Sequence, residues 1–156
     1  MATEIEKKFL IISDDWRLLG SGEDYCQGYL STEKGRTIRV RTINDRGILT
    51  IKGPTVAGAR LEYEYDIPIN EAREILQELC RKPLIEKTRY KIPFRGFIWE
   101  VDEFKGENEG LIFAEIELES RGQSFAKPPW IGKEVTDDSR YYNANLVKNP
   151  FSNWQK

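Results

Sequence analysis

Histidine is missing from this sequence of 156 residues. It is the usual general base near neutral pH, a common metal ligand, and the partner of serine or cysteine in many nucleophilic sites. Its absence excludes all of these arrangements. Catalytic chemistry in this chain must therefore use carboxylates, lysine, arginine, tyrosine or a bound metal.

Cysteine is almost as scarce, with only Cys26 and Cys80. Their separation fits neither a zinc site nor a redox pair, so the sequence predicts two buried free thiols in a reducing compartment. No apolar run approaches the ~20 residues of a membrane span. The start, Met1-Ala2-Thr3-Glu4, lacks the basic and apolar regions of a secretory signal. We therefore expect a cytoplasmic protein.

An excess of either charge is also lacking, since 24 Lys and Arg stand against 26 Asp and Glu. The net charge of -2 produces no field that would steer the chain onto nucleic acid or a membrane surface. We expect neither partner, so any anion site must be local. The length, without a linker or an internal repeat, predicts one domain over 1–156. The sequence leaves a homodimer open.

What the sequence does contain is an alternation of charged and apolar residues, which is typical of β-strands. In the first strand Glu4, Glu6 and Lys8 share one face, and Phe9 lies on the other. Further segments repeat the pattern, and most are joined by short turns. The sequence predicts strands at 4–12, 24–31, 37–42, 48–52, 60–67, 85–92, 97–104 and 111–119.

Helices are expected to be few and short. A helical piece should begin after Ser13, a helix should span 71–80 with Asn70 as its N-cap, and a capping signal within 135–139 predicts a helix that ends near 148. We predict an α+β fold, in which an eight-stranded antiparallel β-barrel has a charged interior and helices packed outside.

The charged faces of these strands could lie in water or inside the barrel. In an ordinary antiparallel sheet the charged face meets bulk water, and this interpretation fits any single strand. Here, however, charged residues occupy alternate positions, and so one face, on nearly every strand, with few neutral polar residues among them. We therefore favour a polar lumen. A lumen that holds only structural ion pairs is the alternative.

A lumen crowded with Asp and Glu needs either protonation of some carboxylates or cations among them. Carboxylates without His or Cys select Mg²⁺ or Mn²⁺ over Zn²⁺ or Cu²⁺. Lysine and arginine in the same lumen require an anion. A chain of phosphates satisfies both sets, because metal can bridge its oxygens while guanidinium groups bind the rest.

Several short motifs, in this order, together resemble the CYTH domain family, also called triphosphate tunnel metalloenzymes. They are Glu4-x-Glu6-x-Lys8, Arg39-x-Arg41, Thr50-Ile51-Lys52, Glu62-x-Glu64, Glu86-Lys87-x-Arg89-Tyr90, Trp99-Glu100-Val101-Asp102 and Ala114-Glu115-Ile116-Glu117. The resemblance implies an eight-stranded antiparallel tunnel, dependence on Mg²⁺ or Mn²⁺, and substrates that bear a triphosphate. Near the end, Arg140-Tyr141-Tyr142-Asn143 departs from the family's Arg-Tyr-Ser-Asn.

The resemblance also implies a role for each matched position. Metal would be held by Glu4, Glu6, Glu115 and Glu117, with Glu62, Glu64 and Asp102 as secondary acidic positions that orient cations or a metal-bound water. Phosphate oxygens would be held by Lys8, Arg39, Arg41, Lys52, Lys87 and Arg89. Our candidate catalytic residues are Lys87, Arg41 and Tyr29. Lys87 and Tyr29 share the inward parity and are expected to help the leaving group, although Tyr29 could equally only line the wall.

The expected function is hydrolysis of inorganic triphosphate by in-line attack of water, with two metal ions per site. One ion would polarise the phosphates and the other would activate the water. An adenylyl cyclase and a thiamine or nucleoside triphosphatase are the enzymatic alternatives. A metal-dependent polyphosphate-binding module is the non-enzymatic one.

Overall fold

The computed structural model describes residues 2–33, 35–57 and 59–154. Within these ranges the strands are β1 (Ala2–Glu4), β2 (Glu6–Ile11), β3 (Gly22–Ser31), β4 (Thr37–Ile43), β5 (Arg46–Lys52), β6 (Arg60–Ile67), β7 (Ile85–Phe94), β8 (Phe97–Phe104), β9 (Ile112–Glu117) and β10 (Ile131–Glu134). The α-helices are α1 (Ile69–Glu78) and α2 (Asn143–Lys148). Four short 3-10 helices are η1 (Asp15–Leu18), η2 (Gly106–Asn108), η3 (Ser139–Tyr141) and η4 (Phe151–Asn153).

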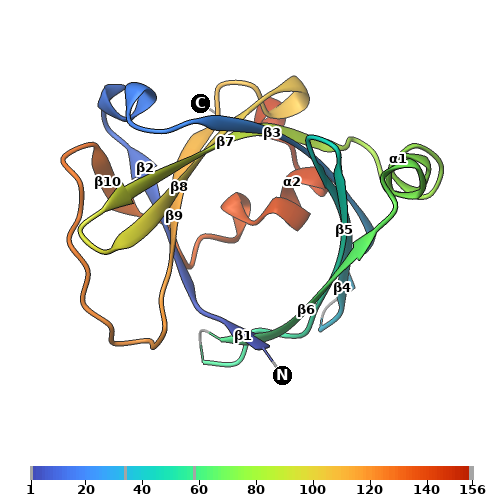
Figure 1. The fold of residues 1–156 in the computed structure, drawn as a ribbon, viewed down its shortest axis with the longest axis horizontal. Coiled ribbons are helices and arrows are strands. Elements are labelled where there is room, and N and C mark those ends of the chain that lie inside the picture. The colour runs from blue at the N-terminus through green and yellow to red at the C-terminus, as the bar shows by residue number, and fades with distance from the viewer. Residues whose placement is uncertain (1, 34, 58, 155–156) are drawn as a thin grey trace.

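All ten strands belong to one antiparallel sheet. Their order among the described residues is β1-β6-β5-β4-β3-β7-β8-β9-β2-β10. The sheet curls strongly, so that the strands follow one another around a ring in Figure 1. The predicted antiparallel sheet with few helices is confirmed. The predicted closed barrel is not, because the order of paired strands in the described ranges ends at β1 and β10.

The first predicted strand is divided at Ile5. β1 pairs with β6, whereas β2 pairs with β9 on one side and β10 on the other. A single extended segment therefore contacts strands from both ends of the sheet order. The count of eight strands was wrong for this reason, and because the alternation gave no signal for β10, a strand of only four residues that contains Gly132.

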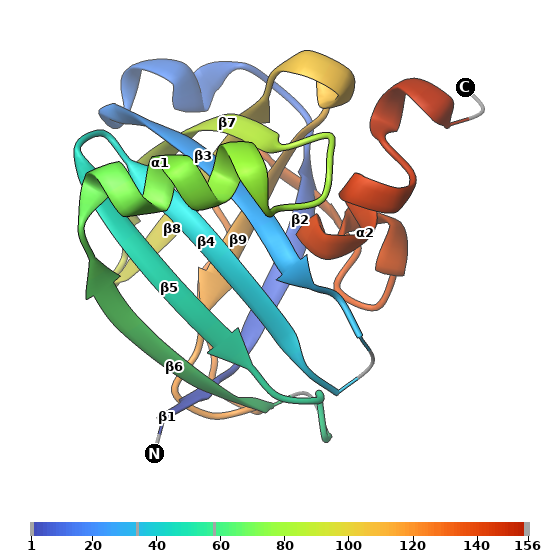
Figure 2. The ribbon, with the colours of Figure 1, turned by 90° about the vertical axis from the view of Figure 1, so that its right-hand side faces the viewer.

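Helix α1 lies on the outside of the sheet across β4 and β5 (Figure 2). Gly47 permits this close packing, because a Cβ at Gly47 would lie only 2.7 Å from the Cβ of Ala72. The predicted cap was wrong, since the helix begins at Ile69 with Pro68 at the N-cap position and no side-chain cap. No helix in the described part of the chain is both long and apolar enough to span a membrane.

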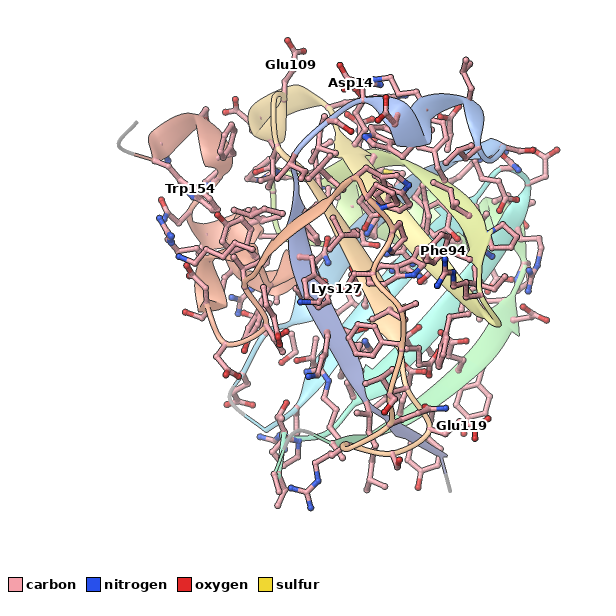
Figure 3. All side chains as sticks on the ribbon, turned by 90° about the vertical axis from the view of Figure 1, so that its left-hand side faces the viewer. Asp14, Phe94, Glu109, Glu119, Lys127 and Trp154 are labelled. Atoms are coloured by element: carbon pink, nitrogen blue, oxygen red, sulfur yellow. The ribbon has the colours of Figure 1, made fainter. Side chains whose placement is uncertain are left out.

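Two larger apolar clusters pack against other parts of the sheet. The first lies around Phe9, Trp99 and Trp130, under the loop between β9 and β10. Figure 3 shows Lys127 on this loop, and its Nζ lies 5.2 Å from the centre of the Phe9 ring. The second cluster joins Phe113 of the sheet to Leu146 of α2.

The second cluster fixes the C-terminal segment across one end of the strand ring. In Figure 1 α2 projects inside the ring, and in Figure 2 it lies beside one end of the strands. The predicted tail helix is thus present but divided into η3 and α2. The segment covers this end of the inward face with Tyr141, Leu146 and Val147.

Candidate active site

The strand register places the charged residues on one continuous face. Residues directly opposite one another in neighbouring strands project to the same side of a sheet. Lys8 lies opposite Glu115, Arg41 opposite Gln27, and Lys52 opposite Glu62. Such pairs continue from strand to strand around the sheet. They place one set of residues on the side that faces the inside of the ring, here called the inward face: Glu6, Lys8, Tyr25, Gln27, Arg39, Arg41, Thr50, Lys52, Glu62, Glu64, Lys87, Arg89, Glu100, Asp102, Glu115 and Glu117.

The cations of this inward face are buried. Every one of the six predicted phosphate-binding side chains is at most 9% exposed; these are Lys8, Arg39, Arg41, Lys52, Lys87 and Arg89. On the opposite side of the sheet Tyr63 and Tyr65 are exposed. Bulk water therefore meets the outward face at β6, and apolar clusters cover that face elsewhere, so the interpretation in which the charged face as a whole is the solvated one is wrong.

Asp102 lies at the centre of the first charged group and is completely buried. Its carboxylate accepts hydrogen bonds from Arg89 Nε at 2.7 Å, Arg89 Nη2 at 2.8 Å and Lys87 Nζ at 2.7 Å. Burial alone would raise the pKa of Asp102, but the two cations lower it. Burial and the nearby Arg89 lower the pKa of Lys87, although Asp102 opposes this.

Glu115 connects this group to the first strand. Its Oε1 lies 3.4 Å from Arg89 Nη2 and 3.3 Å from Lys8 Nζ. Lys8 also lies 3.6 Å from Glu6. Burial works to lower the pKa of Lys8, but Glu115 and Glu6 together raise it above its usual value. Lys8 therefore remains protonated between two carboxylates.

The second charged group comes from β4, β5 and β6. Arg39 Nη2 donates to Thr50 at 3.3 Å and lies 3.9 Å from Glu64, while Lys52 lies 3.3 Å from Glu62. The Nε of Arg39 is buried and has no hydrogen-bond partner among the described residues. A buried donor without a partner is costly, so this atom is suited to an incoming acceptor.

Arg41 lies between the two groups and contacts a neutral side chain. Its Nε donates to the Oε1 of Gln27 at 2.9 Å. Burial, followed by repulsion from Arg39 and Arg89, lowers the pKa of Arg41. The centre of the inward face thus carries more positive charge than its own carboxylates compensate, and an anion there would relieve the repulsion.

The acidic residues of the inward face form opposed pairs. Glu6 lies directly opposite Glu117, and Glu115 directly opposite Glu100. Among the residues described, no three acidic side chains gather closely enough to form a metal site by themselves. The arrangement nevertheless fits Mg²⁺ or Mn²⁺, because such ions are commonly held by one or two carboxylates together with substrate phosphates. The side chain of Glu4 lies outside the described residues.

Besides Glu6 and Glu115, three further predicted metal positions contact cations. Glu62 and Glu64 lie beside Lys52 and Arg39, and the oxygens of Asp102 accept from Lys87 and Arg89. Of the two roles that the resemblance implied for these residues, their geometry favours the orientation of cations.

The candidate catalytic tyrosine packs beneath the C-terminal segment. Tyr29 is only 3% exposed and belongs to the cluster of Tyr141 and Leu146. Its hydroxyl accepts a hydrogen bond from Gln27 at 3.3 Å. This position favours the alternative in which Tyr29 lines the wall, whereas Lys87 and Arg41 lie in the charged part of the face.

Four polar or aromatic residues that contact the site were not among the site residues predicted from the sequence. Tyr25, Gln27 and Thr50 share the inward alternation, which could have indicated them. Asn143 had no such signal, and its Oδ1 comes within 3.4 Å of Lys87 Nζ only because α2 packs at the end of the sheet.

Comparisons with known proteins match nearly the whole chain. Residues 2–148 match the CYTH domain. An inorganic triphosphatase of Acetivibrio thermocellus is 56% identical over 156 residues, which is 100% of both chains. An inorganic triphosphatase of Nitrosomonas europaea is 36% identical and covers 93% of this chain and 97% of its own.

A solved structure supports the same assignment. The crystal structure of an inorganic triphosphatase superposes with a TM-score of 0.68 at 32% identity, covering 92% of this chain and 97% of the other. The family match over residues 2–148 includes every strand that carries one of the six buried cations. This chain therefore belongs to the CYTH domain family.

Proposed function

We propose that this protein hydrolyses inorganic triphosphate on its inward face. The observation that carries the proposal is the burial of six lysine and arginine side chains on one face, where Arg39 Nε has no hydrogen-bond partner among the described residues. A compact anion with many oxygens suits cations that approach from several strands. The names of the two curated relatives support the same substrate.

We extend the proposal to a closed tunnel of strands. The segment 2–11 pairs through β1 with β6 and through β2 with β9, so it would complete the wall between the two halves of the sheet. The C-terminal segment would then close one end, where Asn143 contacts Lys87. We further expect that 1–156 acts as one domain in the cytoplasm.

Glu6, Glu115 and Glu117 would hold Mg²⁺ or Mn²⁺, two ions per site, together with phosphate oxygens and with Glu4. A bound divalent ion would supply Lewis acidity and lower the pKa of a water molecule. The chain itself would bind the triphosphate through Arg39, Arg41 and Lys52. Asp102 would hold Arg89 and Lys87 in place, and Lys87 Nζ would neutralise charge on the departing oxygen.

Inorganic triphosphate should be preferred over ATP by at least ~10-fold in kcat/KM, or about 1.4 kcal/mol. The aromatic rings of the inward face are already in use: Arg41 lies over Tyr25, Lys87 over Phe104, and Lys8 over Phe113. An adenine would therefore compete with a cation for each of these three buried rings. The measurement is competition between the two substrates in one reaction.

Three outcomes would contradict the proposal. Equal or better use of ATP would favour a nucleotide substrate, and the appearance of cyclic AMP would identify a cyclase. Tight binding of triphosphate without phosphate release, with Mg²⁺ present, would leave a binding module.

Arg39→Ala is expected to raise KM and lower kcat, with a combined loss of ~10- to 100-fold in kcat/KM. The buried guanidinium would make charge-assisted hydrogen bonds to phosphate both in the bound substrate and in the transition state. Arg46→Ala is the matched control, because Arg46 lies in the neighbouring strand β5 but is exposed and pairs with Asp66 at 3.0 Å. Equal losses in the two variants would show that substrate does not bind at the buried centre of the inward face.

A further inference from the structure

Tyr25 lies in β3, between the two strands that carry the central arginines. β3 pairs with β4 on one side and β7 on the other. The Tyr25 side chain is 4% exposed. Its ring centre lies 5.0 Å from the guanidinium carbon of Arg41 and 5.1 Å from that of Arg89. Lys87 Nζ lies 5.9 Å away. One aromatic ring thus contacts cations from both neighbouring strands.

Cations are attracted to the face of an aromatic ring within about 6 Å of its centre, and more strongly where water is excluded. The three cations around Tyr25 repel one another. Asp102 compensates Arg89 and Lys87, whereas Arg41 donates to the neutral Gln27 and lies over the ring of Tyr25 itself. The ring therefore attracts Arg41 without placing a full negative charge beside it.

This neutrality matters for an anionic substrate. A carboxylate at position 25 would form an ion pair with Arg41 and compete with phosphate for the same guanidinium hydrogens. A tyrosine ring interacts with the face of a guanidinium and leaves its N–H groups, which lie in the guanidinium plane, available to an acceptor. Gln27 engages only the Nε of Arg41.

Building on the proposed function, we propose that Tyr25 is a positioning residue for triphosphate binding, because its ring holds Arg41 in place with the two Nη groups of Arg41 available to phosphate oxygens. Arg89, which Asp102 already holds, packs against the same ring. This role needs the face of the ring and its electron density, and it does not need the hydroxyl group.

The test compares three side chains at position 25 in the full chain. Tyr25→Phe keeps the ring and should leave KM for triphosphate within about 2-fold of wild type. Tyr25→Leu removes the ring and should raise KM by ~10-fold, with a smaller fall in kcat. A strongly fluorinated phenylalanine at the same position keeps the ring shape but withdraws its electron density, and should raise KM nearly as much as leucine does.

Tyr90→Leu is the matched control. Tyr90 is the residue after Arg89 in β7 but packs on the outward side, where its ring meets Trp16 at 5.1 Å. This variant should lower the melting temperature and leave KM unchanged. The fluorinated variant keeps the comparison informative even if Tyr25→Leu does not fold, because it preserves the packing of the ring.

The outcomes separate the two proposals. An unchanged KM in the fluorinated variant, or an equal loss in Tyr25→Phe and Tyr25→Leu, would overturn the role of the ring while leaving the triphosphatase intact. A wild-type protein that neither binds nor hydrolyses triphosphate would refute the proposed function and this inference with it.

Discussion

Asp102→Asn is expected to lower the free energy of unfolding by about 3 kcal/mol and to reduce triphosphate hydrolysis at least ~100-fold. Asp102 is fully buried and accepts hydrogen bonds from both Arg89 and Lys87. Replacing its carboxylate with an amide leaves two buried cations without their central counter-charge and places an NH₂ group against one of these donors. Urea unfolding and phosphate release would measure the two effects.

Asp66→Asn is the control for the loss of stability. Asp66 forms an ion pair with Arg46 at 3.0 Å, but its side chain is 78% exposed, so the same substitution should change stability by less than ~1 kcal/mol. If Asp102→Asn were as stable as Asp66→Asn, the central group would not be a compensated ion network.

The second large effect is expected for Glu117→Gln, which should reduce hydrolysis at least ~100-fold at limiting Mg²⁺. Glu117 lies directly opposite Glu6, and two carboxylates at directly opposed positions repel unless a cation lies between them. The substitution removes a charged metal ligand and also removes this repulsion. Stability without metal should therefore change little or increase, which distinguishes the loss of a ligand from the loss of a packing group.

Glu103→Gln is the matched control for Glu117. Glu103 lies in β8 next to Asp102 but faces outward, where it pairs with Arg17 at 3.1 Å. It should keep wild-type turnover. Titration of each protein with Mn²⁺, followed by its electron paramagnetic resonance signal, would show weaker metal binding in Glu117→Gln alone. Wild-type turnover and Mn²⁺ affinity in Glu117→Gln would exclude this residue as a ligand.

Much of the candidate site could be predicted because strand alternation is a local property. Arg39 and Arg41 lie on the inward face, and Val40 between them packs fully buried under α1. The side-chain period of two requires this separation wherever the segment is a strand. The same rule correctly placed Lys87 and Arg89 together on the inward face of β7.

The distinction between Tyr25 and Tyr29 could not be predicted in this way. Both residues have the same parity on β3, and only their position along the strand separates them. Tyr25 lies opposite Lys87, whereas Tyr29 packs beneath the C-terminal segment with Tyr141. The docking of that segment depends on contacts with several strands, from Tyr29 to Phe113, which leave no periodic signal in the sequence.

The sequence by itself determined the available chemistry and the side of the sheet on which it lies. With no histidine and with charged residues alternating with apolar ones, the chain could build only a site of carboxylates, lysine, arginine and tyrosine, with or without a bound metal. The tertiary structure decided which of these groups meet. Asp102 joins Lys87 to Arg89, and Glu6 faces Glu117, because strand register and sheet curl are set by the simultaneous packing of all strands rather than by any one segment.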